Sequence, residues 1–128
     1  MCKQIHGEHV LLKIISDTIK SNFKHPSLAA GRWRTFTFLE QMANVGSEVS
    51  RALNWQEKGN QSHSLSAYER ALELLYLTID DPGNLARVRE LTRLHEALVD
   101  FFQGSNEYGS SEAILRRYFD AFAYEARR

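Results

Sequence analysis

Apolar residues recur at helical spacing through almost the whole chain from Phe36 to Ala126, and this periodicity constrains the fold more than any other feature. The breaks between the periodic segments fall on Gly, Pro, Asn and Ser, which are typical of helix ends and turns. These breaks do not separate runs with the alternating pattern of strands. The pattern therefore predicts an all-α domain.

The periodic segments predict four core helices and an additional N-terminal helix. The first, at 8–23, is amphipathic, and it ends before Pro26 because a proline disfavours helical geometry in the residue before it. We expect the others at 35–58, at a segment ending near residue 79, at 85–103, and after a loop at 105–111. The predicted fold is an up-and-down four-helix bundle with an additional N-terminal amphipathic helix.

Two details of the helix ending near residue 79 concern its start and its apolar stripe. Ser66 and Glu69 have the spacing of a capping box, although Ser62 or Ser64 could equally be the cap. The stripe consists of Leu65, Tyr68, Leu72, Leu75 and Ile79.

Part of the surface of the helix predicted at 35–58 consists of small residues, so a partner helix could approach it closely there. These residues are Ala43, Gly46, Ser47 and Ser50.

The length of 128 residues fits one domain with a core that needs no disulfide or metal. Charged residues are distributed unevenly along the chain. Residues 1–34 contain six Lys/Arg and two Asp/Glu, whereas residues 35–128 contain ten Lys/Arg and fourteen Asp/Glu. We therefore assign 1–33 to an N-terminal extension with the amphipathic helix and a linker, and 34–128 to the bundle. A poorly packed extension is the alternative interpretation of the first segment.

Overall composition excludes several classes of protein. Sixteen basic and sixteen acidic residues cancel, so nucleic acid is a possible partner but not a favoured one. The longest apolar stretch is too short to cross a bilayer, and we expect no membrane association. Cys2 is the only cysteine, which favours a reducing, cytoplasmic location.

His95 lies in the apolar stripe of the helix at 85–103, where an ionisable ring needs a partner or a lowered pKa. The run Arg-Glu-Leu-Thr-Arg-Leu-His from Arg89 to His95 resembles the Arg-x4-6-His motif of the HEPN superfamily, helical bundles that include ribonucleases. The resemblance implies that His95 is the acid or base toward a ribose 2′-hydroxyl and that Arg89 holds the phosphate. However, six residues along a helix leave two side chains about 120° apart, and Glu90 stands where the motif favours Asn or Asp. We expect a buried, hydrogen-bonded structural histidine, with the catalytic pair as the alternative.

Cys2, His6 and His9 form the one group with the spacing of ligands for a soft divalent metal. A fourth ligand is not evident, and the group lies at a terminus, where disorder is common. The chain also lacks the Glu-x-x-His pairs of di-iron bundles. We therefore expect no metal site and no cofactor.

The loop before the last helix is the candidate binding surface. It contains Glu107 and Tyr108, and its flexible Gly109 suits a segment that presents side chains for recognition. Arg116 and Arg117 follow in the last helix and, with four further arginines, could form a basic strip for phosphate. The further arginines are Arg32, Arg34, Arg127 and Arg128. The alternative interpretation is a plain connector, capped by Ser110 or Ser111, beside a solvated helix face.

Two further resemblances concern the fold. The segment from Trp55 to Pro82, with Ala-Tyr-Glu-Arg-Ala-Leu-Glu-Leu at 67–74, resembles one tetratricopeptide repeat. Solenoids need about three repeats and no second copy follows, so this segment indicates a local helix hairpin.

Four runs between Trp33 and Ala126 are similar to a family of small uncharacterised helical-bundle proteins of bacteria and archaea. These are Gln-Met-Ala-Asn-Val-Gly-Ser-Glu-Val at 41–49, Arg-Ala-Leu-Glu-Leu-Leu at 70–75, Arg-Glu-Leu-Thr-Arg-Leu at 89–94 and Asn-Glu-Tyr-Gly-Ser-Ser at 106–111. The likeness implies a compact helical domain without an assigned activity and dispensable residues before it.

The sequence favours a non-enzymatic interaction or scaffolding module that forms a homo-oligomer or binds a protein partner. The reason is an excess of apolar side chains at 72–79 and 118–122, more than a single buried stripe requires. A HEPN-like ribonuclease, or another nucleotide-directed enzyme, that uses Arg89 and His95 is the alternative.

Overall fold

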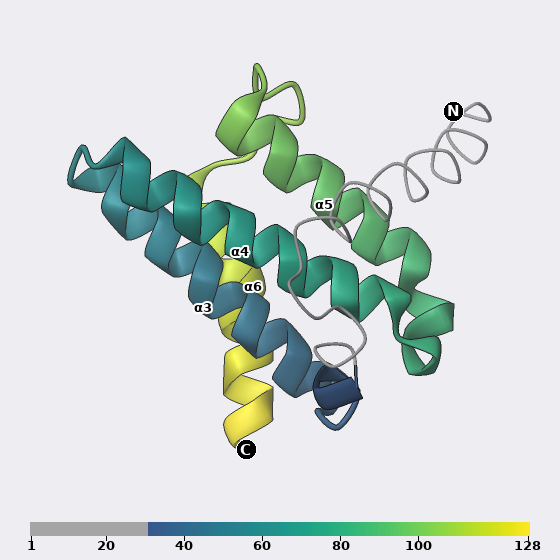
Figure 1. Cartoon of the computed structure of the whole chain (residues 1–128). Helices are drawn as coiled ribbons and strands as arrows, with labels where there is room; N and C mark the ends of the chain where they lie inside the picture. The colour runs from purple at the N-terminus through teal and green to yellow at the C-terminus, as the bar shows by residue number, and fades with distance from the viewer. Residues whose placement is uncertain (1–30) are drawn as a thin grey trace.

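The computed structural model describes residues 31–128, and within that range the chain is all-helical, without strands (Figure 1). Its elements are α3 (Phe38–Glu57), α4 (Gln61–Asp80), the 3-10 helix η1 (Pro82–Arg87), α5 (Val88–Gln103) and α6 (Glu112–Arg127). The all-α prediction is confirmed. The helix predicted at 8–23 lies outside the described residues.

α3 begins three residues later than the predicted start at Thr35, because the capping residue is Thr37. The Thr37 hydroxyl accepts a hydrogen bond from the Glu40 amide at 3.2 Å, and the Glu40 carboxylate accepts one from the Thr37 amide at 2.8 Å. This capping box satisfies two backbone donors that a helix start would otherwise leave free. Thr35 and Phe36 lie in the turn before it.

α4 begins earlier than any of the serines proposed as its cap. Asn60 is the N-cap, and its side chain accepts a hydrogen bond from the His63 amide at 3.0 Å. Ser64 is instead buried inside the helix and donates to the Ala52 carbonyl of α3 at 2.8 Å. The predictions of a cap at Ser62, Ser64 or Ser66 are therefore wrong, since Asn60 already caps the helix directly after the turn at Gly59.

α4 lies between α3 and α5 (Figure 1). Five consecutive residues, 75–79, are buried near its C-terminal end, so neighbours surround this part of the helix on every side. Leu65 at the other end is 45% exposed and is not part of the core, contrary to the predicted stripe. Most of the apolar side chains at 72–79, which were predicted to exceed a single buried stripe, are thus buried within the chain.

α6 packs against α3, and the two helices approach each other closely at Gly46. A Cβ atom on Gly46 would lie 2.7 Å from the Cβ of Phe119, closer than real Cβ atoms approach one another. This confirms that the small residues admit a partner helix. Beside the contact lies an open groove of about 260 Å³. It is lined by Ala43, Gly46, Ser47, Ser50, Phe119, Asp120 and Ala123.

The connection between α4 and α5 is a 3-10 turn, where we expected the next helix to begin directly at Leu85. Asp81 caps it by accepting a hydrogen bond from the Gly83 amide at 2.9 Å, and Pro82 follows in the first turn. The backbone of Asn84 is not helical (φ −106°), which separates this turn from the regular helix that starts at Val88.

Helix ends further along the chain match the sequence pattern. α5 ends at Gln103 with Gly104 as its C-cap, as predicted. Ser111 is the cap of α6, and its hydroxyl accepts a hydrogen bond from the Ile114 amide at 3.1 Å.

Trp33, placed at the end of the predicted linker, belongs to the core. Residues 31–33 are helical, and the Trp33 side chain is 6% exposed. The packed part of the chain therefore includes the last residue of the segment 1–33.

Candidate functional site

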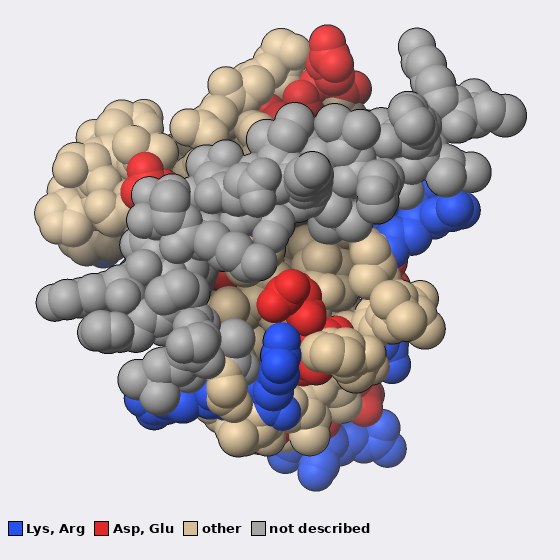
Figure 2. All heavy atoms as spheres, turned by 45° about the vertical axis from the view of Figure 1, so that its right-hand side comes forward, with Lys and Arg blue, Asp and Glu red and all other residues tan. Residues whose placement is uncertain are grey.

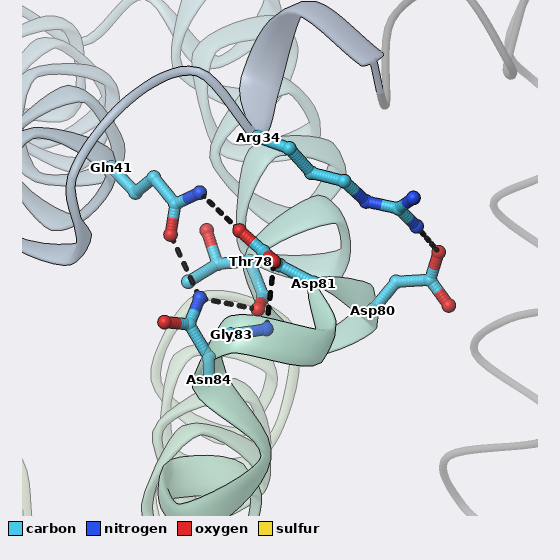
Figure 3. A network of polar contacts seen from close by, with 7 residues as sticks. All are labelled: Arg34, Gln41, Thr78, Asp80, Asp81, Gly83 and Asn84. Atoms are coloured by element: carbon cyan, nitrogen blue, oxygen red, sulfur yellow. Dashed lines mark hydrogen bonds and ion pairs between the residues drawn. The ribbon is translucent and has the colours of Figure 1, made fainter.

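A polar junction, defined by the buried residues Gln41, Thr78 and Asn84 and the partly buried Asp81, joins α3 to the end of α4 and to η1 (Figure 3). Gln41 is completely buried, and its amide nitrogen donates to the Trp33 carbonyl at 3.1 Å and to the Asp81 carboxylate at 2.9 Å. Its amide oxygen accepts from the Asn84 side chain at 2.8 Å. Burial strengthens these bonds and makes the loss of any one of them costly.

The other members of the junction are also paired within the chain. Asn84 donates to the Thr78 carbonyl at 2.9 Å, near the C-terminal end of α4. The Thr78 hydroxyl accepts from the Trp33 indole at 3.0 Å and donates to the Leu74 carbonyl at 2.9 Å. These hydrogen bonds hold together the Trp33 segment, α3, α4 and η1. Because the polar groups are paired with one another, we interpret the junction as structural.

This junction was not predicted from the sequence. Residues 80–84 were expected only to separate two helices, and Gln41 was not among the predicted site residues. One feature of the sequence could have indicated that Gln41 is buried. It directly precedes Met42 and lies one turn before Val45, and both of these apolar residues are completely buried.

His95 is buried, as its place in the apolar stripe predicts, with 5% of its surface exposed. Burial lowers its pKa from 6.5 to about 4, so the ring is neutral at pH 7. The expected hydrogen bond is missing at one ring nitrogen: Nε2 is buried without a partner in the described part of the chain, and so is the Thr92 hydroxyl, one turn away on α5. Arg89, the other half of the HEPN-like pair, lies on the exposed part of the same helix.

The loop after α5 is organised by Asp100. Its carboxylate accepts hydrogen bonds from the backbone amides of Glu107 at 2.8 Å and Tyr108 at 3.0 Å. Asn106 adopts a left-handed conformation (φ 59°), and its side chain is bonded to both the amide and the carbonyl of Ser110. The loop is therefore held by several bonds, and the backbone amides of residues 106–110 are already used within the chain.

Tyr108 projects from this loop and is 60% exposed. Its hydroxyl donates to the Glu96 carboxylate at 3.0 Å, and this bond, followed by burial and the nearby carboxylates, raises the pKa of Tyr108. The ring face remains available for contact. The surroundings of the hydroxyl, which include Glu96, Asp100 and Glu107, are acidic.

The two basic residues proposed for binding, Arg116 and Arg117, differ in how far they are bonded within the fold. Arg116 is tied into the fold, because it contacts the Glu112 carboxylate at 2.8 Å and donates to the Asn54 side chain of α3 at 2.8 Å. Arg117 is exposed. Of the other arginines of the predicted strip, Arg34 pairs with Asp80 and Arg128 with Glu125. On the face shown in Figure 2, basic and acidic side chains of the described residues are interspersed.

Glu57 and Glu112 bring two carboxyl groups together where the end of α3 meets the start of α6. A hydrogen bond with Glu112 and charge repulsion between the two groups raise the pKa of Glu57, while the same hydrogen bond and Arg116 lower the pKa of Glu112. Both groups are at the surface. This pair was not predicted, because its members are far apart along the chain.

Rings gather along one side of α6, and this aromatic patch consists of Ile114, Tyr118 and Phe122 with Phe38 and Arg87. The Phe122 ring lies 5.3 Å from the Tyr118 ring and 5.8 Å from the Phe38 ring, and the Arg87 guanidinium lies 4.1 Å above Phe38. Ile114 precedes Tyr118 by one turn and is 54% exposed. The patch is only partly covered, since Phe38, Tyr118 and Phe122 are half-buried.

The metal candidates Cys2, His6 and His9 lie outside the described residues. Within 31–128, no three His, Cys, Asp or Glu side chains come together in a way that could hold a metal ion. None of the helices in this range combines the length and the apolar character needed to span a membrane.

Comparison with known proteins returns no match to this chain among protein-family models, curated proteins or solved structures.

Proposed function

We propose that this protein is a self-associating interaction or scaffolding module. One observation carries the proposal: α6 buries only Leu115 and Phe119, and the other large apolar side chains of this helix are half or fully exposed. Ile114 is 54% exposed, and Tyr118 and Phe122, one and two turns further along the same side, are half-buried. An apolar helix side left open to water in this way is typical of a surface that is covered in an assembly.

The state of His95 supports a structural role over an acid–base one. General acid–base catalysis works best with a pKa near the working pH and with the group in reach of a substrate proton. Burial holds the pKa of His95 at about 4 and leaves 5% of the residue exposed. The HEPN-like alternative makes a different prediction, namely that His95→Ala abolishes RNA cleavage while helicity and melting stay nearly intact.

The finer architecture and the location belong to the same proposal. We infer an up-and-down order of the four long helices, because short connections join α3 to α4 and α4 to α5. We place the protein in the cytoplasm, where a single cysteine stays reduced. Its partner is a second copy of the chain or another protein.

Sedimentation velocity of the full chain across a wide concentration range tests the proposal. We expect a dimer or larger species whose share increases with concentration. A monomer at every concentration, together with RNA cleavage that disappears in His95→Ala without loss of helicity, would replace the proposal with the enzymatic alternative.

A further inference from the structure

The chemistry of the aromatic patch matches that of interface centres. Tyr, Phe and Arg are enriched in the buried centres of protein interfaces and among the residues that contribute most to binding. Here two phenylalanines, one tyrosine and one arginine are arranged in contact, with ring centroids 5.3 and 5.8 Å apart and the guanidinium at 4.1 Å. They come from three different elements, α3, η1 and α6, whose packing fixes their relative positions.

A cation and an anion both lie at the patch. Arg87 lies over Phe38, and Glu90, at the start of α5, accepts a hydrogen bond from the Tyr118 hydroxyl at 3.0 Å. A surface with only one sign of charge repels a second copy of itself and favours an oppositely charged partner. A surface with both signs can instead meet its own copy, with the cation of one facing the anion of the other.

We infer that the aromatic patch is the contact surface of a two-fold symmetric homodimer. A two-fold interface brings the same surface of both copies together, so it must be complementary to itself. In this dimer, Ile114, Tyr118 and Phe122 of one copy pack against the same residues of the other, and Arg87 faces the Glu90 of the second copy. The inference rests on the proposed self-association and names the surface that mediates it.

Two residues of α6 provide a matched pair of variants. Ile114 and Tyr124 are similarly exposed, at 54% and 62%, and both belong to the same helix. Residues of an α-helix follow one another at about 100°, which places Tyr124 about 120° around the helix from Tyr118. Ile114→Glu therefore puts a carboxylate into the patch, and Tyr124→Glu puts the same group outside it. A glutamate at 114 also suits the first turn of α6, where negative charge is favourable.

Sedimentation equilibrium of the full chain measures the dimer dissociation constant of each variant, with thermal melting to verify folding. We expect Ile114→Glu to raise the constant by about tenfold or more, and Tyr124→Glu to leave it close to that of the unchanged protein.

A charge exchange tests the two-fold pairing independently of Ile114. Arg87→Glu places two acidic groups opposite each other and weakens the dimer, whereas adding Glu90→Arg reverses the pair and restores association. Failure of the double variant to recover would overturn the pairing of Arg87 with Glu90 across a two-fold axis.

The outcomes separate this inference from the proposal on which it rests. An unchanged protein that dimerises, with Ile114→Glu and Arg87→Glu dimerising equally well, overturns the patch as the interface and leaves self-association standing. An unchanged protein that is monomeric throughout overturns both.

Discussion

His95 is an ionisable side chain that folding keeps from ionising. Its ring is removed from water, and burial alone lowers its pKa to about 4. The buried Nε2 atom and the Thr92 hydroxyl are both without a hydrogen-bond partner in the described residues. Buried polar atoms without partners each cost roughly 1–3 kcal/mol, so this part of α5 is less stable than an apolar version of it.

We therefore expect His95 to make the stability of the protein decrease as the pH is lowered from 6.5 to 4. The pKa of His95 is lower in the folded protein than in the unfolded chain, so the unfolded chain binds the proton more tightly. The stability that depends on a neutral His95 ring is fully present above pH 6.5 and is lost as the pH falls toward 4. The free energy of unfolding should decrease by about 3 kcal/mol over that interval, measured by urea unfolding at several pH values.

His95→Leu is the variant that isolates this effect. We expect it to be at least as stable as the unchanged protein at pH 7, and to lose less stability between pH 6.5 and 4. Other groups also contribute to the pH dependence, including Glu73, whose pKa is raised by burial, but they are common to both proteins. Equal losses in the two proteins would show that the ring of His95 is not responsible.

Asn84 has a larger structural role than its place in the turn between α4 and α5 indicates. Asn84→Ala removes the bonds to the Gln41 side chain and to the Thr78 carbonyl, and both acceptors stay buried without that donor. We expect the free energy of unfolding to decrease by about 2–4 kcal/mol, measured by denaturant unfolding. Asn44→Ala is the matched control, because Asn44 is exposed and donates only to the Glu40 carbonyl of its own helix. A similar loss in both variants would contradict the special role of the junction.

At the scale of helices, the contact between α3 and α6 depends on the absence of a side chain at Gly46. Alanine favours a helix over glycine by about 1 kcal/mol, so Gly46→Ala would stabilise α3 considered alone. In the folded protein its Cβ would meet the Cβ of Phe119 at 2.7 Å. The clash is with the first side-chain atom, so a rotation of the Phe119 ring does not relieve it and the helices must separate.

We therefore expect Gly46→Ala to destabilise the protein by about 1–3 kcal/mol, measured by thermal and urea unfolding. Ser47→Ala, at the exposed neighbouring position, should stay within about 0.5 kcal/mol of the unchanged protein. A more stable Gly46→Ala protein would mean that helix preference outweighs the packing of α6 on α3.

At the scale of the whole molecule, folding and association should be linked. α6 packs on α3 through few buried residues and has one apolar side open, so a second copy that covers this side stabilises the folded state. Any partner that binds only the folded chain raises the melting temperature as its concentration increases. We expect the melting temperature to rise by a few degrees between low and high micromolar protein, measured by scanning calorimetry, and Ile114→Glu to abolish the rise. A melting temperature independent of concentration would argue against a stabilising assembly.

Much of the helical organisation follows from the sequence because it depends on nearby residues. A helix end at Gly104, a cap at Ser111 and an inward-facing His95 each reflect interactions within one or two turns. The close approach at Gly46 was also predictable, because a patch of small residues leaves space for a neighbour. The start of α4 was missed because three serines with capping chemistry follow Asn60, and only the completed turn decides which residue is used.

The sequence by itself determined that the described chain is helical, where most helices end and that His95 faces inward, since these properties arise from local hydrogen bonding and from the spacing of apolar residues. Only the tertiary structure decided that Gln41 and Asn84 are buried partners, that α6 is the helix seated on Gly46, and that rings on α3 and α6 form a patch with Arg87. These contacts join residues about 40 or more positions apart, and their geometry depends on how whole helices pack, which periodicity does not specify.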